Sequence, residues 1–91
     1  MIARRLVIRG RVQGVGYRDA MVAAARAVGA VGWVRNLRDG AVEALVQGDP
    51  ETVERVVVWC RRGPPAAAVA EVVTAPASIE PHDDFVRRAS G

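Results

Sequence analysis

The stretch VGWVRNLRDGAVEALVQG, residues 31–48, decides the fold. Residues 31–37 and 41–47 are both rich in residue types that favour strands, and Arg38-Asp39-Gly40 lies between them. An Asp-Gly pair between two such runs is typical of a β-hairpin, because glycine tolerates the positive φ that tight turns require. We therefore predict two antiparallel strands joined by a short turn.

A helix is predicted on each side of this hairpin. Upstream, apolar residues at helical spacing start near Asp19 and stop at Gly29, a residue type that commonly ends helices. Downstream, Asp49 is the expected N-cap and Pro50 the first helical residue, and Gly63-Pro64 ends the helix. The hairpin is therefore expected to sit between two helices in the chain.

Strands are predicted outside both helices. Residues 4–12 alternate between apolar and polar positions, residues 66–74 form a fourth strand with a small, Ala-rich start, and residues 85–89 can form a short fifth strand. The order is then β-α-β-β-α-β. We predict an α+β ferredoxin-like sandwich, with an antiparallel-rich sheet and two helices on one face, as a single domain over residues 1–91.

Composition narrows the class of protein. The chain has 91 residues, a net charge of +3, and 13 basic residues that are all Arg. Genome composition is the simpler explanation for the Arg content, and selection for bidentate anion contacts is the alternative. One Cys allows no internal disulfide, which favours a reducing cytoplasm. No apolar run approaches membrane-spanning length, and no spacing of ligand residues predicts a metal site.

The predicted topology brings two distant segments together. The first two strands are joined through a helix, so a right-handed crossover makes them parallel and places their C-terminal ends at one edge of the sheet. Residues 13–18 follow the first strand, and Asn36 lies near the end of the second. We expect these segments to meet.

The loop of residues 13–18 suits an anion. Its backbone N–H groups can form a nest at the start of a helix, where the helix dipole also favours negative charge. Gly14 and Gly16 would let the backbone approach a ligand closely, and Arg18 could close over a bound phosphate. Glycine also occurs in such turns for steric reasons alone, so this pattern by itself leaves both interpretations open.

Two long motifs stand out in the sequence. Residues 8–18, Ile-Arg-Gly-Arg-Val-Gln-Gly-Val-Gly-Tyr-Arg, resemble the first signature of the acylphosphatase family, G-x-V-Q-G-V-x-F-R. Residues 32–43, continuing to Gly48, resemble its second, and Gly63-Pro64-Pro65 with Ala67-x-Val69 also fits. The resemblance runs from about residue 6 to residue 85.

The resemblance implies an enzyme that hydrolyses a small-molecule acyl phosphate to a carboxylate and inorganic phosphate, without a metal or other cofactor. It implies that Arg18 binds the phosphoryl group and that Asn36 orients the attacking water. It also implies that backbone N–H groups bind the phosphate, those of Gln13, Gly14, Val15, Gly16 and Tyr17. Inorganic phosphate or sulfate should compete with the substrate, and we expect a monomer.

Elementary chemistry agrees with these roles. A carboxylate is a good leaving group, so positioning and charge stabilisation can suffice for phosphoryl transfer. An amide is not a strong base, but its carbonyl oxygen can hold a water in line with the bond to be broken.

Two other kinds of protein compete with this interpretation. RNA-recognition domains share the element order, but they stack bases on aromatic residues of the first and third strands, and these strands have none here. Nucleic acid is therefore not an expected partner. A non-catalytic anion-binding or regulatory ferredoxin-like module remains the alternative.

The side chains around the motifs carry further expectations. Tyr17 stands where the family more often has Phe, and a partly exposed loop would tolerate its hydroxyl. The Gln13 side chain is expected to brace the loop and not to contact substrate. Cys60 is expected in the core, and Arg87-Arg88 are expected to be solvated. The tail lacks the Tyr with which many relatives end, so the pairing of the last strand stays open.

Overall fold

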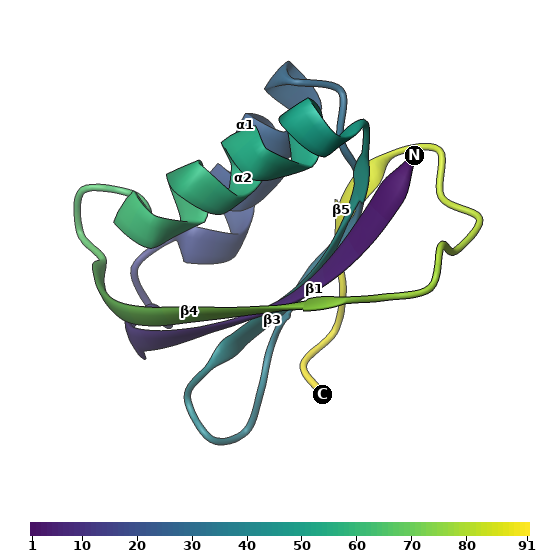
Figure 1. Cartoon of the computed structure of the whole chain (residues 1–91). Coiled ribbons are helices and arrows are strands. Elements are labelled where there is room, and N and C mark those ends of the chain that lie inside the picture. Colours follow the sequence, from purple (N-terminus) through teal and green to yellow (C-terminus); the bar gives the residue numbers. More distant parts are fainter.

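The computed structural model describes residues 1–91 and has the predicted order of elements (Figure 1). These are β1 (Ile2–Arg11), α1 (Tyr17–Ala27), β2 (Val31–Asn36), β3 (Val42–Gly48), α2 (Pro50–Arg62), β4 (Ala68–Pro76) and β5 (Phe85–Arg87). Predicted and observed ends differ by one or two residues at most.

The five strands form one sheet in the order β4-β1-β3-β2-β5. β3 pairs antiparallel with both β1 and β2, so β1 and β2 run parallel to each other with β3 between them. β4 pairs antiparallel with β1, and β5 pairs parallel with β2, which resolves the pairing of the last strand. The C-terminal ends of β1, β2 and β5 therefore lie at one edge of the sheet.

Both helices cover the same face of the sheet, as predicted (Figure 1). Alternate residues of the central strands point into the layer between sheet and helices. Cys60 is fully buried there, which confirms its predicted place in the core. The core includes Leu6, Ile8, Met21, Ala25, Val42, Ala44, Val46, Val53, Val56 and Val57.

The ends of the helices lie where the sequence predicted them. Gly29, at φ 77°, ends α1 in a Schellman motif, in which its N–H donates to Arg26 O (3.1 Å) and Ala30 N–H donates to Ala25 O (3.0 Å). Asp49 is the N-cap of α2, as predicted, although its side chain makes no capping hydrogen bond. Pro50 at the first helical position and Glu51 in the positive first turn favour the start of α2 instead.

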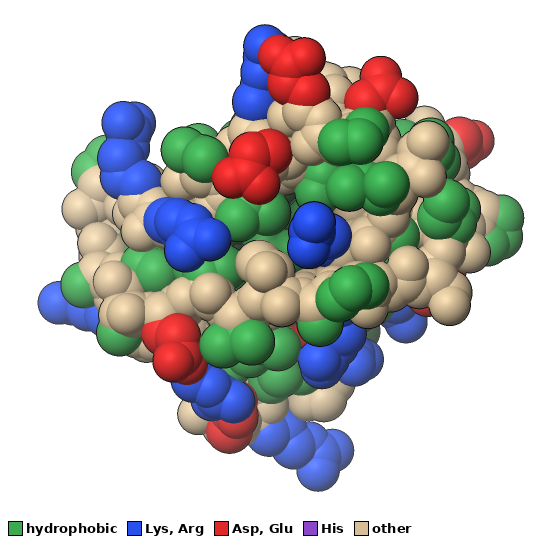
Figure 2. Space-filling model, viewed as in Figure 1, with side chains coloured by type: hydrophobic (Ala, Val, Ile, Leu, Met, Phe, Trp, Pro, Cys, Tyr) green, Lys and Arg blue, Asp and Glu red, His purple; other side chains and the backbone are tan.

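The other face of the sheet carries charge and one small apolar cluster. Glu43 of β3 is nearly buried between two arginines, accepting hydrogen bonds from Arg5 Nε (2.6 Å) and Arg35 Nε (2.7 Å). Trp33 packs beside this triad with Leu45. Basic and acidic side chains are interspersed over the face of the molecule that Figure 2 shows. Neither helix is long and apolar enough to cross a membrane.

Candidate anion-binding site

A cavity of about 190 Å³ opens where β1 passes into α1. Its walls come from the loop, from the first turn of α1 and from the end of β5. The lining residues are Val12, Gly14, Gly16, Tyr17, Arg18, Asp19 and Arg87. The predicted anion loop therefore borders a real hollow in the surface.

The two loop glycines hold left-handed backbone conformations, with φ 73° at Gly14 and 77° at Gly16. A Cβ built at either position would meet no other protein atom within 4 Å. The positive φ, and not crowding by the protein, is thus the structural reason for glycine here. Gly16 also directly precedes α1 as its N-cap.

The backbone N–H groups of residues 13–19 are free of protein acceptors. Outside the regular strands and helices, the first hydrogen bond after β1 is donated by Ala20, whose N–H reaches Gly16 O at 3.1 Å. The loop and the first turn of α1 therefore present a run of free donors at the positive end of the helix dipole. This is the arrangement that binds oxyanions.

The Gln13 side chain ties this loop to the β2–β3 turn. Its Nε2 donates to Leu37 O and to Ala41 O, both at 2.8 Å. The side chain therefore braces the loop, as the sequence indicated. The bonds also confirm that the loop meets the end of β2.

The Arg18 guanidinium is unpaired within the protein. Arg5, Arg9, Arg26, Arg35, Arg55 and Arg87 each form an ion pair. Arg18 lines the cavity and makes no ion pair or side-chain hydrogen bond, so its whole planar fork is available to a ligand.

Asn36 is the last residue of β2, but it does not line the cavity with Arg18. Its Oδ1 is buried and receives no hydrogen bond from the protein. Leaving a buried acceptor unmatched costs about 1–3 kcal/mol. Its neighbour Leu37 is bonded to Gln13, which places Asn36 next to the braced loop. This side chain is thus an acceptor kept free close to the site.

Tyr17 is buried, at 1% exposure, so the expectation that a partly exposed loop accommodates its hydroxyl is wrong. Its hydroxyl donates to Cys60 O at 2.8 Å. Four residues further on, Pro64 has no N–H with which to satisfy that helix-end carbonyl, so the hydroxyl satisfies it instead. Burial raises the pKa of Tyr17, which keeps the hydroxyl a donor. The bond fixes the start of α1 against the end of α2.

Arg87 is the functional candidate that sequence reasoning missed. It is exposed, as expected, but it also lines the cavity and donates from Nη1 to Asp19 Oδ1 at 2.9 Å. Arg88 is exposed as well, and its guanidinium lies 4.4 Å from the centre of the Trp33 ring. The sequence did not reveal which strand β5 pairs with. Because β5 lies parallel to β2, its last residue, Arg87, lies at the same edge of the sheet as the anion loop.

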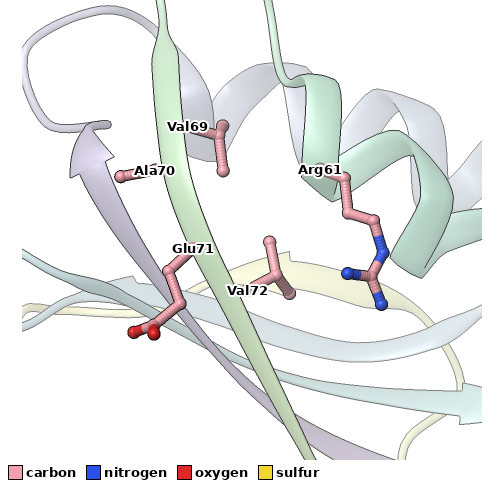
Figure 3. Close-up of a pocket in the computed structure, with 5 residues that line it drawn as sticks. All are labelled: Arg61, Val69, Ala70, Glu71 and Val72. Carbon is pink, nitrogen blue, oxygen red and sulfur yellow. The ribbon is translucent and has the colours of Figure 1, made fainter.

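A larger depression, of about 330 Å³, lies between the end of α2 and β4 (Figure 3). Its lining offers Arg61 and the small apolar side chains Val69, Ala70 and Val72. Figure 3 shows Glu71 pointing away from Arg61. Few polar groups converge there, so volume alone does not make it the better site. No three His, Cys, Asp or Glu side chains gather closely enough to hold a metal ion.

Comparison with known proteins agrees with this geometry. A sequence model of the acylphosphatase family matches residues 4–87. An acylphosphatase of Acidiphilium cryptum is 52% identical over 91 residues, which is 100% of both chains. A crystal structure of acylphosphatase from Bacillus subtilis superposes with a TM-score of 0.93 at 32% identity, covering 97% of this chain and 99% of that one.

Part of a larger protein has the same fold. Full-length HypF, solved in a phosphate- and nucleotide-bound form, matches 98% of this chain with a TM-score of 0.90 at 26% identity, although only 12% of HypF is covered. The sequence match extends through both motifs and nearly the whole chain. The chain therefore belongs to the acylphosphatase family.

Proposed function

We propose that this acylphosphatase breaks the carboxyl-phosphate bond by in-line attack of water, without a metal ion. Arg18 and the backbone N–H groups of residues 13–17 bind the phosphoryl group, and Asn36 orients the water. The observation that carries the proposal is the free Arg18 guanidinium beside a run of free N–H donors in one cavity.

Phosphoryl transfer mainly requires that charge on the peripheral oxygens be stabilised. Fixed N–H donors and a guanidinium fork supply this stabilisation without reorganising during the reaction. The leaving group is a carboxylate, which departs without being protonated first. A phosphate oxygen of the substrate takes the proton of the water, so no side chain need act as a strong base.

The free side-chain oxygen of Asn36 supports the proposal that this residue orients the attacking water. No protein donor holds Oδ1 in place, so the amide is free to turn towards the site, accept one hydrogen of a water and orient the water's lone pair. The bond from Gln13 to Leu37, the residue after Asn36, places this acceptor beside the loop that carries Arg18.

We also propose inorganic phosphate as a competitive ligand, and a monomer in the cytoplasm. The phosphate-bound form of HypF supports the first point, because part of that protein shares this fold. The one cysteine, Cys60, is free and buried, which suits a reducing compartment.

The test is release of phosphate from benzoyl phosphate, measured with and without a strong chelator. The chelator should leave the rate unchanged. Arg18→Ala should raise the inhibition constant of inorganic phosphate and lower kcat by roughly 10²–10³-fold. Asn36→Ala should lower kcat while the inhibition constant stays the same, because its contact with the water matters only as attack begins.

Arg55→Ala is the matched control, since Arg55 lies on α2 and does not line the cavity. It should behave as the wild type. Activity that a divalent metal restores after chelation would refute the metal-free mechanism. Loss of phosphate affinity in Asn36→Ala with kcat intact would refute the assigned roles.

A further inference from the structure

A second arginine reaches the cavity of Arg18 from the last strand. Arg87 ends β5, and β5 runs parallel to β2, so its C-terminal end lies at the same sheet edge as the anion loop. Arg18 and Arg87 line the same hollow of about 190 Å³. Two guanidinium groups at one small cavity can act on a single bound anion.

Asp19 holds the Arg87 side chain at this position but occupies only one of its N–H donors. The only hydrogen bond of the Arg87 guanidinium joins Nη1 to Asp19 Oδ1 at 2.9 Å, so its other N–H donors have no protein acceptor. The two side chains are 47% and 73% exposed, and exposed ion pairs contribute little stability. The guanidinium can therefore turn towards a ligand at little cost.

We propose that Arg87 contacts the phosphoryl oxygens of the bound substrate, as a second binding cation beside Arg18. This inference rests on the proposed function, in which the loop and Arg18 hold that phosphoryl group. One planar fork contacts two oxygens, whereas the transition state spreads charge over three. Arg87, at the end of β5, reaches an oxygen that the Arg18 fork leaves free, and Asp19 keeps the side chain in place beforehand.

The competing interpretation is that Arg87 only neutralises Asp19, whose carboxylate would otherwise repel an anion. The two interpretations differ once Asp19 is removed. A direct contact persists in an Asp19→Asn background, whereas a neutralising role disappears there. A double-mutant cycle therefore separates them.

The experiment measures the inhibition constant of inorganic phosphate, together with kcat and KM for benzoyl phosphate, at constant ionic strength. The variants are Arg87→Gln, Asp19→Asn and the double variant. Arg55→Gln is the matched control, because it removes the same charge and breaks an exposed ion pair with Glu51 on α2. Urea unfolding checks that each variant is folded.

Arg87→Gln should raise the phosphate inhibition constant roughly tenfold, and by a similar factor in the Asp19→Asn background. Arg87→Lys should restore only part of the affinity, since an ammonium lacks the fork. Arg55→Gln should change nothing. An unchanged constant in Arg87→Gln, a constant in the double variant equal to that of Asp19→Asn, or an equal rise in Arg55→Gln would each overturn the inference.

Arg18→Ala separates the failure of this inference from that of the site itself. If Arg18→Ala raises the constant and Arg87→Gln does not, the site stands and only the role of Arg87 is wrong. If neither variant changes it, phosphate does not bind at this cavity.

Discussion

Replacing Gln13 by Leu tests whether the brace beneath the anion loop positions the site. Leu is close in size to Gln but cannot donate, so the change removes the two 2.8 Å bonds from Nε2 to Leu37 O and Ala41 O. The loop then loses its only side-chain tie to the β2–β3 turn.

The structure sets the size of the stability loss. Leu37 O still receives the N–H of Gly40 at 3.3 Å, and Ala41 O still receives that of Leu37 at 2.8 Å. Neither carbonyl is left without a donor, so the cost is that of two ordinary hydrogen bonds, about 1–2 kcal/mol. With the urea dependence usual for a small domain, the unfolding midpoint should fall by roughly 1 M.

The effect on activity should be larger than this stability loss suggests. A displacement of about 1 Å in a positioned loop can cost roughly 10²-fold in rate. We expect kcat/KM for benzoyl phosphate to fall by roughly 10–100-fold, and the inhibition constant of inorganic phosphate to rise.

Gln47→Leu is the matched control at the other end of the sheet. Gln47 also ties a loop by two bonds, donating to Glu80 O at 2.9 Å and accepting from Glu80 N at 2.6 Å. This variant should lose at least as much stability, because Glu80 N is left without a partner, and it should keep its kcat/KM while folded. If Gln13→Leu loses stability but keeps kcat/KM, or if both variants lose activity equally, the reasoning about the brace is refuted.

Three further predictions follow from single contacts. Arg18→Lys should lower kcat/KM by roughly 10²-fold in the benzoyl phosphate assay, because a point charge cannot replace the fork. Tyr17→Phe should lower the free energy of unfolding in urea by about 1–3 kcal/mol, because Cys60 O loses its donor. Burial alone would raise the pKa of Glu43, but hydrogen bonds from Arg35 and Arg5 lower it overall. The triad should therefore stabilise the fold above the unfolded pKa of about 4.3 and lose that effect as the pH falls below it. Thermal unfolding at several pH values should show a weaker acid dependence in Glu43→Gln.

The elements could be predicted because their signals are local. Asp39-Gly40 marks the hairpin turn within its own segment, and Gly29 ends α1 through hydrogen bonds to the preceding turn. The crossover rule then brings the anion loop beside the end of β2 without any knowledge of side chains. The bond from Gln13 to Leu37 bears out that juxtaposition.

The contacts that could not be predicted join segments far apart in sequence. The Tyr17 ring packs in the core, and its hydroxyl satisfies the Cys60 carbonyl of α2 because Pro64, far along the chain, has no N–H to do so. Arg87 reaches the cavity because β5 pairs with β2, and a three-residue strand has too short a pattern to reveal its partner. The residues next to Tyr17 and Arg87 in the sequence therefore do not reveal either contact.

The two ends of the sheet show why the chemistry belongs at one of them. At each end an amide side chain fixes a loop through a bond to a backbone carbonyl: Gln13 donates to Leu37 O, and Gln47 donates to Glu80 O. In the segment after β4, Ala77 N–H donates to Ala3 O and Glu80 N–H donates to the Gln47 side chain. The backbone N–H groups of that segment are therefore used to fix the segment to the rest of the protein.

The anion loop differs in how it is held. Residues 13–19 donate no backbone N–H to the protein, so the loop is fixed from outside by the Gln13 side chain and by the Tyr17 hydroxyl. Anchoring through side chains keeps a rigid loop with its backbone donors free. A loop that used those donors for its own structure could be equally rigid, but it would have nothing left to offer a phosphate. The same logic explains why the tests proposed for Gln13 and Arg18 must differ: the first removes the support of the cavity, and the second removes one of its binding groups.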